Sequence, residues 1–414
     1  MLKDYSYFLS IILSPFVTVF VSIVTMRFVE PELIGYYQTS QLILMYLSFL
    51  HLGVYSGLAR QYPIAIGKDL DGHADAILSS VGYFTNLIAL AGSIIVLIIV
   101  LIMYLNGAKP LLLVTIGITI IISFLSTKTT FLDVVFRVRQ LFSGYGNIIL
   151  TQNLMNIITT ILPMAFGYIG LLIKTIIYVS LSYIIRARKT DIPGKNSFDM
   201  GVLFTLARIG LPILASTYLY QIMFSLDRTV LALFVDMRSL GNYAISAHIS
   251  AVFLAIVGGV SAYFTPKAIV ESTNSIRSNY GYLYKSVILC SVLIIPGIVI
   301  GYLYIGAFID FFIPEYHGAI EAAKVTLLSG FSYILLTGSF VFVVLKKTGI
   351  YILMLVCVII LYACGTYILI GMYGITSIES LAWIKLVVIA LFSIALMLTA
   401  LSYIYRFQHE KLIQ

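Results

Sequence analysis

Charged side chains are scarce in this chain of 414 residues, because Asp, Glu, Lys and Arg together make up only 10% of it. Soluble domains carry about 25% charged residues. Hydrophobic side chains account for 61% of the sequence, and the mean hydropathy is +1.05. This composition excludes a soluble globular domain and predicts an integral membrane protein.

Cysteine and histidine are also rare, with three and five residues respectively. The cysteines, Cys290, Cys357 and Cys364, all lie inside apolar runs, and the histidines are scattered without the spacing of metal ligands. The sequence has neither a nucleotide-binding P-loop nor a long polar loop with paired carboxylates. The location of all three cysteines inside apolar runs argues against a disulfide framework. We expect no metal, no cofactor and no enzymatic activity.

Apolar runs recur from one end of the chain to the other. Crossing a bilayer takes roughly 20 apolar residues, and about twelve runs approach that length. They lie near residues 8–27, 36–58, 77–105, 110–132, 145–165, 166–185, 202–225, the latter part of 229–263, 282–306, 319–345, 350–373 and 380–405. The first run has no small-residue cleavage site, so we interpret it as a retained helix. The predicted fold class is an all-α polytopic membrane protein.

The placement of the net charge of +8 predicts the topology. With both termini in the cytoplasm, the opposite face carries only Arg27, Lys109, Arg228 and Arg238, and most other basic residues are cytoplasmic. This is the positive-inside pattern, so we interpret the cations as topology signals and expect no nucleic-acid partner.

Two similar patterns divide the chain into halves. Gly35-Tyr36-Tyr37 is followed by an apolar run and then Pro63, and Gly241-Asn242-Tyr243 by an apolar run and then Pro266. The longest polar stretch, residues 186–197, lies between the halves. We predict an N-terminal six-helix lobe at residues 1–187, a cytoplasmic linker at 188–200 and a C-terminal six-helix lobe at 201–414. Two like lobes around a central cavity are typical of transporters.

Four basic residues, Lys174, Arg208, Lys324 and Lys385, lie inside predicted spans. Charges at membrane depth are costly and usually face a cavity, so this set predicts binding of an anionic group such as phosphate or pyrophosphate. Arg208 and Lys385 could instead extend to a membrane interface. Lys324 could form a local pair with Glu321.

Charges near the ends of spans give further candidates. Arg60, at the cytoplasmic end of the second span, could contact a substrate phosphate or act as a topology anchor. Arg27, at the outer end of the first span, is its counterpart on the release side. Asp227, beside Arg228, could bind a coupling proton or sodium ion, or form a structural pair.

The fifth predicted helix is unusually polar. Asn153, Asn156 and Thr160 are spaced by three and four residues, so they share one helix face. In a membrane, that face should contact water, a sugar or another helix. Both glycan binding and helix packing fit this pattern.

Short motifs in both halves resemble those of a known family. Residues 31–37 (PELIGYY), Leu52-Gly53-Val54, and the pattern Gly57-Leu58-x-Arg60-x-x-Pro63-x-x-x-Gly67-Lys68 resemble the amino-terminal signature of Wzx-type oligosaccharide flippases. Asp227-Arg228 followed by residues 240–243 (LGNY) is similar to the family pattern for the seventh and eighth helices. These flippases belong to the multidrug/oligosaccharidyl-lipid/polysaccharide exporter (MOP) superfamily. The sequence departs from many relatives at Ala59, where they have Asn.

The resemblance implies two six-helix bundles related by pseudo-two-fold symmetry around a V-shaped central cavity, with alternating access. It implies translocation of an undecaprenyl-pyrophosphate-linked oligosaccharide, such as an O-antigen unit, across the bacterial inner membrane. Lys174, Lys324 and Lys385 would supply a cation-lined cavity. Expected partners are the lipid-linked glycan, membrane lipids and a polysaccharide polymerase of the same pathway. The resemblance leaves open whether a proton or sodium gradient drives transport.

Two alternative functions remain open at the level of sequence. A drug or cation antiporter of the same superfamily would need buried carboxylates, and this chain buries cations. A membrane-embedded O-antigen polymerase or ligase would have a long outer loop, and the sequence has none. The flippase is therefore the prediction that fits the sequence best.

Overall fold

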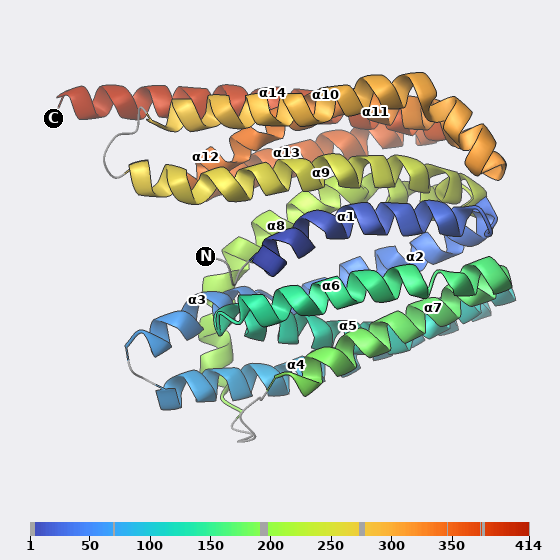
Figure 1. Ribbon diagram of the computed structural model, residues 1–414, viewed down its shortest axis with the longest axis horizontal. Coiled ribbons are helices and arrows are strands. Elements are labelled where there is room, and N and C mark those ends of the chain that lie inside the picture. The colour runs from blue at the N-terminus through green and yellow to red at the C-terminus, as the bar shows by residue number, and fades with distance from the viewer. Residues whose placement is uncertain are drawn as a thin grey trace. The chain divides into compact units, whose positions relative to one another are not determined.

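The computed structural model describes residues 5–68, 71–190, 198–272, 278–345, 347–372, 374 and 377–413. Within these ranges the chain forms helices and contains no strand (Figure 1). Nine helical stretches of this described part are long and apolar enough to cross a membrane, or ten if one bent pair is a single span. A shorter apolar stretch, Leu13–Met26, lies in the first helix. The prediction of an all-α polytopic membrane protein is confirmed.

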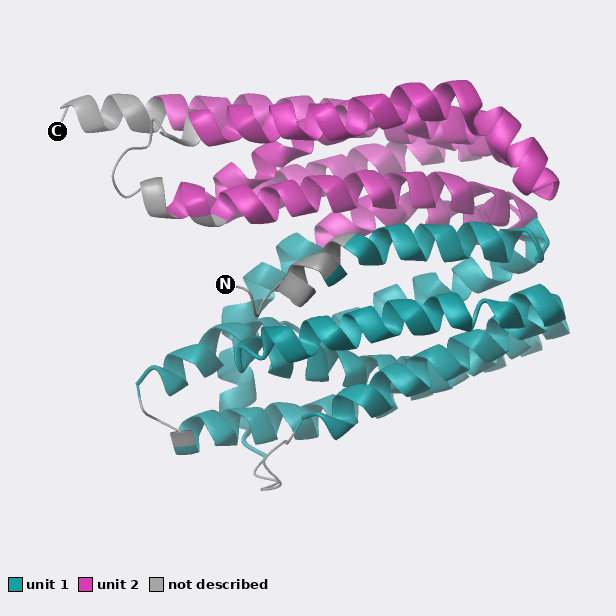
Figure 2. Cartoon of the chain, viewed as in Figure 1, with its two compact units in different colours: residues 1–218 teal, residues 219–414 magenta. Residues whose placement is uncertain are grey.

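The chain divides into two compact units, residues 1–218 and 219–414 (Figure 2). The boundary falls inside α8 (Met200–Phe234), so the first part of this helix packs with unit 1. Of the linker predicted at 188–200, residues 191–197 lie outside the described residues.

Two helices of unit 1, α2 (Pro31–Leu47) and α5 (Pro110–Val138), start at prolines, because a proline at the first helical position needs no N–H partner. Its elements are α1 (Tyr5–Met26), α2 (Pro31–Leu47), the 3-10 turn η2 (Ser48–His51), α3 (Val54–Ile66), α4 (Asp71–Leu105), α5 (Pro110–Val138), α6 (Phe142–Ile158), α7 (Ile161–Arg188) and the first part of α8.

The packing of unit 1 is centred on α5. This helix contacts α4 and α7, while α1 contacts α6 and α3 contacts α4. The core between α3, α4, α5 and α8 buries Leu58, Leu78, Val135 and Leu206. The far side of α4 exposes large apolar side chains, including Leu97. Exposed apolar side chains on a helix that is apolar on all sides are typical of a surface that faces lipid.

The second predicted span, residues 36–58, is broken in the structure. The stretch Pro31–His51, which contains α2 and η2, meets α3 at an angle of 48°. The break occurs because Leu52 (φ 45°) and Gly53 (φ 81°) both adopt left-handed backbone conformations. Two successive left-handed residues cannot continue a right-handed helix.

The predicted division between the fifth and sixth spans, at residues 165 and 166, lies next to a kink at Gly167 (φ 56°, ψ −131°). A Cβ atom at Gly170 would lie 2.0 Å from the Leu162 carbonyl oxygen, so the segments on the two sides of the kink pack closely. The earlier break between α6 and α7, at Thr159 and Thr160, is a local turn that sequence analysis did not predict.

Unit 2 contains the rest of α8 and the carboxyl-terminal helices. Its elements are α9 (Met237–Ser272), α10 (Ser278–Phe312), the 3-10 turn η3 (Pro314–Ala319), α11 (Ile320–Leu335), the 3-10 turn η4 (Leu336–Gly338), α12 (Ser339–Val344), α13 (Thr348–Tyr367), the π-helical turn η5 (Ile368–Met372) and α14 (Ile378–Ile413).

Helix α11 lies at the centre of unit 2, because it contacts α9, α10 and α14. The core around it buries Phe253, Ile294, Tyr333, Phe392 and Leu396. The predicted tenth span, residues 319–345, corresponds to α11 and α12 with the short turn η4 between them.

Candidate functional site

Lys174 lies on α7 and is a buried cation of unit 1. Its residue is 6% exposed, and its Nζ donates a hydrogen bond to Thr160 Oγ1 at 3.0 Å. Thr160 Oγ1 in turn donates to the Asn156 carbonyl oxygen at 2.7 Å. Within the described ranges no carboxylate lies within ion-pair distance of Lys174. The ammonium is therefore removed from water without a counter-charge.

The polar face of α6 contacts another helix. Asn153 exchanges hydrogen bonds with Ser14 of α1, at 3.0 and 3.2 Å, so its amide serves helix packing in this structure. The Asn156 side chain is half-buried, and its backbone carbonyl accepts the Thr160 hydrogen bond. Of the predicted polar face, Thr160 is the residue that contacts Lys174.

A buried network that sequence analysis did not predict joins α5, α6 and α7. Arg186 Nε donates to Asp133 Oδ1 at 2.5 Å, Nη2 donates to Gln152 Oε1 at 2.8 Å, and Nη1 donates to the Ser182 carbonyl at 3.1 Å. Arg186 is buried, although its position at the end of an apolar run suggested a topology signal. The signal available in the sequence was Asp133, the acidic residue of α5.

Asp227 and Lys385 form a buried ion pair in unit 2. Lys385 Nζ on α14 donates to Asp227 Oδ2 on α8 at 2.5 Å, and the side chains are 5% and 1% exposed. The backbone N–H of Arg228 donates to Asp227 Oδ1 at 2.8 Å. Two residues predicted for different roles, substrate binding and ion coupling, thus contact each other.

The other predicted cations are more exposed. Lys324 on α11 pairs with Glu321 at 2.7 Å, and the lysine side chain is 31% exposed, which matches the local pair considered from sequence. Arg60 on α3, Arg27 just after α1, and Arg208 on α8 are exposed. These four residues are not buried, unlike Lys174, Arg186 and Lys385.

Close backbone contact fixes the position of Arg60. A Cβ atom at Gly57 would lie 2.2 Å from the Leu206 carbonyl oxygen, and one at Gly210 would lie 1.9 Å from the Gly53 carbonyl oxygen. Only glycine permits helices to approach this closely. The helix that carries Arg60 is therefore held firmly against α8.

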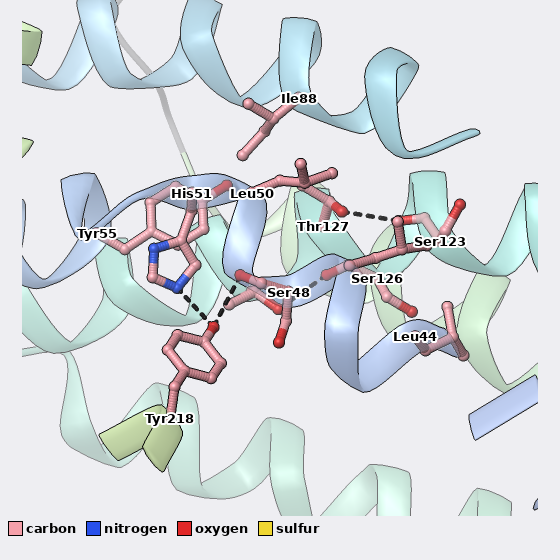
Figure 3. Close-up of a pocket in the computed structure, with 12 residues that line it drawn as sticks. Leu44, Ser48, Leu50, His51, Tyr55, Ile88, Ser123, Ser126, Thr127 and Tyr218 are labelled. Atoms are coloured by element: carbon pink, nitrogen blue, oxygen red, sulfur yellow. Dashed lines mark hydrogen bonds between the residues drawn. The ribbon is translucent and has the colours of Figure 1, made fainter. Parts of the chain in front are cut away.

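A small pocket lies at the bend between α2 and α3 (Figure 3). Tyr218 holds this bend, because its hydroxyl bonds the Ser48 carbonyl at 2.8 Å and His51 Nε2 at 3.0 Å. The pocket is lined by uncharged hydroxyl, aromatic and aliphatic side chains together with the His51 imidazole; its polar residues are Ser48, His51, Tyr55, Ser123, Ser126, Thr127, Thr130 and Tyr218.

The three buried groups, around Lys174, Arg186 and Lys385, differ in their charge balance. In the described part of the chain, the buried acid Asp227 pairs with Lys385, and the half-buried Asp133 pairs with Arg186. Lys174 is buried and lacks such a partner. Unit 1 therefore has a site suited to an anion, and neither deep carboxylate is available for a cationic ligand.

No protein-family model and no curated protein matches the chain. Among solved structures, it is similar to an inward-facing multidrug resistance MATE family transporter of the MOP superfamily, with a TM-score of 0.80 and 12% identity over 94% of this chain and 95% of that one. An outward-facing structure of such a transporter gives a TM-score of 0.69 and 13% identity, over 98% of this chain and 96% of that one. A MOP superfamily transporter from Pyrococcus furiosus gives 0.68 and 13% over the same shares. The chain thus has the fold of MATE transporters of the MOP superfamily.

Proposed function

We propose that the protein is a flippase that moves an undecaprenyl-pyrophosphate-linked oligosaccharide across the bacterial inner membrane by alternating access. The glycan would be an O-antigen unit or a similar surface-polysaccharide unit. The fold supports transport, because proteins with this fold have been solved in inward-facing and outward-facing conformations. The short motifs shared with oligosaccharide flippases support the choice of substrate.

The observation that carries the proposal is the unpaired buried charge of Lys174. A buried ammonium without a counter-charge is unfavourable unless a ligand supplies the charge. A pyrophosphate supplies this negative charge on several oxygens, and Thr160 places a hydroxyl beside the ammonium. We propose Lys174 as the main cation for the pyrophosphate, with the lipid chain remaining in the bilayer.

The exposed cations have separate roles in this proposal. Arg60 would capture the pyrophosphate from the cytoplasmic side, and Arg27 would contact it during release. Arg208 and Lys324 would raise the local concentration of the anionic headgroup through long-range attraction. Both chain termini would be cytoplasmic, and a polysaccharide polymerase of the pathway would use the product.

An antiporter of cationic drugs is the main rival, since its proteins share the fold. It is disfavoured because Asp227 and Asp133 are each paired with a cation. The polarity of the binding pocket varies among proteins with this fold. For the Pyrococcus furiosus transporter, a reverse polarity of the binding pocket suggests a different function. A polymerase or ligase is disfavoured because the long loops expected for such enzymes are absent from the sequence.

The proposal can be tested by translocation in sealed proteoliposomes. A fluorescent undecaprenyl-pyrophosphate glycan is incorporated, and a membrane-impermeant quencher reports how fast it changes leaflet. Wild-type protein should accelerate the loss of protection relative to empty vesicles. Lys174→Gln should slow it by about 10-fold to 100-fold, since a hydrogen bond to a charged group contributes about 1.5–3 kcal/mol.

The matched variants of this assay are Lys174→Arg and Lys109→Ala. Arginine keeps the charge and should retain part of the rate. Lys109 is an exposed lysine that pairs with Glu32 at 2.6 Å, so its loss should leave the rate unchanged. Equal rates for wild type and Lys174→Gln would refute the role of Lys174, and no acceleration by wild-type protein would refute the flippase.

A further inference from the structure

A second pocket of unit 1 lies between α4, α5 and α7, and α5 packs against both of the other helices (Figure 1). Among the described residues, no Asp or Glu lines this pocket, and neither does Lys174 or Arg60. Its polar lining residues are Ser79, Thr85, Asn86, Lys128, Tyr183 and Thr190. The pocket is therefore polar, carries one cation, and is separate from the residues proposed above for the transported solute.

Lys128 of α5 is held in this pocket by aromatic rings. Its Nζ lies 4.5 Å from the centre of the Phe124 ring and 5.9 Å from that of the Tyr183 ring. Such contacts with ring faces position a cation and leave its N–H groups free to donate hydrogen bonds. In the described part of the chain, the ammonium donates no hydrogen bond, and no carboxylate lies within ion-pair distance of it. Lys128 thus presents a positioned cation without an anionic partner.

Two neutral donors accompany the ammonium of Lys128. Neither the side-chain amide of Asn86 on α4 nor the hydroxyl of Tyr183 on α7 bonds any other described residue. The hydroxyls of Thr85 and Thr190, by contrast, already donate to backbone carbonyls four positions earlier, each at 2.8 Å. An ammonium, an amide and a phenol, supplied by three helices, form a donor set suited to the oxygens of a phosphate group.

An exposed apolar stripe on α4 begins at the pocket. It consists of Tyr83, which lines the pocket, followed by Leu87, Leu90 and Ile94, and all four side chains are exposed. Their spacing of four, three and four residues places them on one face of the helix. The stripe is about 16 Å long, at 1.5 Å per residue, which is close to half of a hydrocarbon core of about 30 Å. A ligand with a phosphate headgroup and an acyl chain fits the pocket and the stripe together.

Further positive charge lies next to the pocket. Arg188 and Lys189 are exposed and fall between Ala187 and Thr190, which both line the pocket. The charge pattern of the sequence places this end of α7 at the cytoplasmic face, where basic residues near the membrane attract anionic lipids. The surroundings of the pocket therefore favour a lipid with a net negative charge.

We propose that this pocket binds the phosphodiester of an anionic phospholipid such as phosphatidylglycerol. Lys128, Asn86 and Tyr183 donate hydrogen bonds to the phosphate oxygens, and one acyl chain lies along the apolar stripe of α4. A zwitterionic phospholipid would bring its own ammonium or choline group close to Lys128, and this repulsion weakens its binding. The lipid is a resident partner of unit 1, so the inference does not depend on which solute is transported.

A lysine that only marks the cytoplasmic side of the membrane is the alternative explanation. Such a lysine extends its ammonium toward the headgroups without a defined partner. It would attract anionic lipids weakly and without saturation, and substitution of the uncharged Asn86 would change nothing. The two explanations therefore differ in whether binding saturates and in whether it depends on Asn86.

The test measures lipid binding to the full-length protein in detergent by native mass spectrometry, with dioctanoyl phosphatidylglycerol or dioctanoyl phosphatidylcholine added at increasing concentrations. Wild-type protein should bind phosphatidylglycerol saturably, with a Kd about 10-fold lower than for phosphatidylcholine. Lys128→Gln should weaken the binding of phosphatidylglycerol by about 10-fold, and Lys128→Arg should retain most of it, because the bonds to phosphate are charge-assisted. Asn86→Leu should weaken it by about 3-fold to 10-fold.

Control variants separate the site from general effects of charge and folding. Lys109→Ala removes an exposed lysine that lies outside the pocket and should bind phosphatidylglycerol as wild-type protein does. Equal affinities of wild type and Lys128→Gln for phosphatidylglycerol would overturn the proposal, and so would equal affinities of wild type for the two lipids. If Lys128→Gln cannot be recovered folded, the exposed Asn86→Leu decides the matter, and unchanged binding by that variant overturns the proposal.

A final comparison distinguishes a lipid from a soluble phosphate. Glycerol phosphate has the same phosphate chemistry without acyl chains, so it should displace the lipid only at concentrations more than about 100-fold higher. Leu90→Asn, in the apolar stripe, should weaken the binding of the lipid and leave that of glycerol phosphate unchanged. Binding of glycerol phosphate as tight as that of the lipid would identify a site for soluble phosphates and contradict the lipid assignment.

Discussion

Lys174 and Lys385 are both buried lysines in apolar helices, but their surroundings differ. Lys174 bonds a neutral hydroxyl, whereas Lys385 bonds a carboxylate. Desolvation of an ammonium is unfavourable in both cases, and only Lys385 recovers part of that free energy from an ion pair. The desolvation of the buried ammonium is thus partly compensated at Lys385 and, in the absence of a ligand, uncompensated at Lys174.

The first prediction at this scale concerns Lys174. Replacing it by Met should leave the midpoint of thermal unfolding unchanged or raise it by a few degrees, because an apolar side chain of similar length avoids the desolvation of the charge. The binding of pyrophosphate-linked lipid should fall in the same variant. A large fall in the unfolding midpoint would show that Lys174 serves stability.

The second prediction concerns Asp227. Asp227→Ala leaves the Lys385 ammonium buried without a partner, so the free energy of unfolding should fall by about 3–5 kcal/mol. Asp227→Leu together with Lys385→Met should recover most of this loss. Thermal unfolding of the three proteins in one detergent checks the prediction, and an equally unstable double variant would contradict it.

Sequence analysis identified these charges but could not pair them. Lys174 and Lys385 were recognised because charges are rare in apolar spans, and Asp227 because it lies beside Arg228 near the end of a span. The partner of Lys385 lies 158 positions away in the chain, and nothing local to either residue indicates that contact. The role of Arg186 was missed for the same reason, since Asp133 lies on a different helix.

At the scale of elements, the main feature is the broken span formed by α2 and α3. The break needs two residues with left-handed backbone conformations, Leu52 and Gly53. The sequence offers only Gly53 as a signal, because leucine rarely adopts this conformation. Tyr218 supports the bend from α8 through the Ser48 carbonyl and His51 (Figure 3). Interactions between distant residues therefore decide where this span breaks.

The third prediction tests the close contact between α3 and α8. Gly57→Ala and Gly210→Ala should each lower the free energy of unfolding by about 1–3 kcal/mol, because the new Cβ atoms would overlap backbone atoms of the facing helix. Gly117→Ala is the control, since no atom lies within 4 Å of its added Cβ, and it should be neutral or stabilising. Similar unfolding midpoints for all three variants would contradict the contact.

At the scale of the whole molecule, the hydrophobic pattern was sufficient to predict the fold class. Long apolar runs need little tertiary information to form helices, because the bilayer requires every backbone group to be satisfied within the segment. The breaks inside spans, at Gly53 and at η4, could not be predicted because they depend on packing with other helices.

The fourth prediction concerns topology. With Cys290, Cys357 and Cys364 replaced, Asn106→Cys should react with a membrane-impermeant thiol reagent in right-side-out vesicles, and Lys189→Cys only after the membrane is opened. Both positions are exposed, Asn106 follows α4, and Lys189 follows α7. Labelling of both positions from the same side would contradict the predicted topology.

We propose that this protein, with its MATE-type fold, moves an anionic lipid-linked glycan and not a cationic solute. The most direct test measures the movement of both solutes in one proteoliposome preparation. The solutes are a fluorescent undecaprenyl-pyrophosphate glycan and a cationic dye such as ethidium, and each is measured with and without a proton or sodium gradient. If the proposed function is correct, the protein accelerates movement of the glycan lipid, and the dye shows no protein-dependent movement. Movement of the dye without movement of the glycan lipid would contradict it.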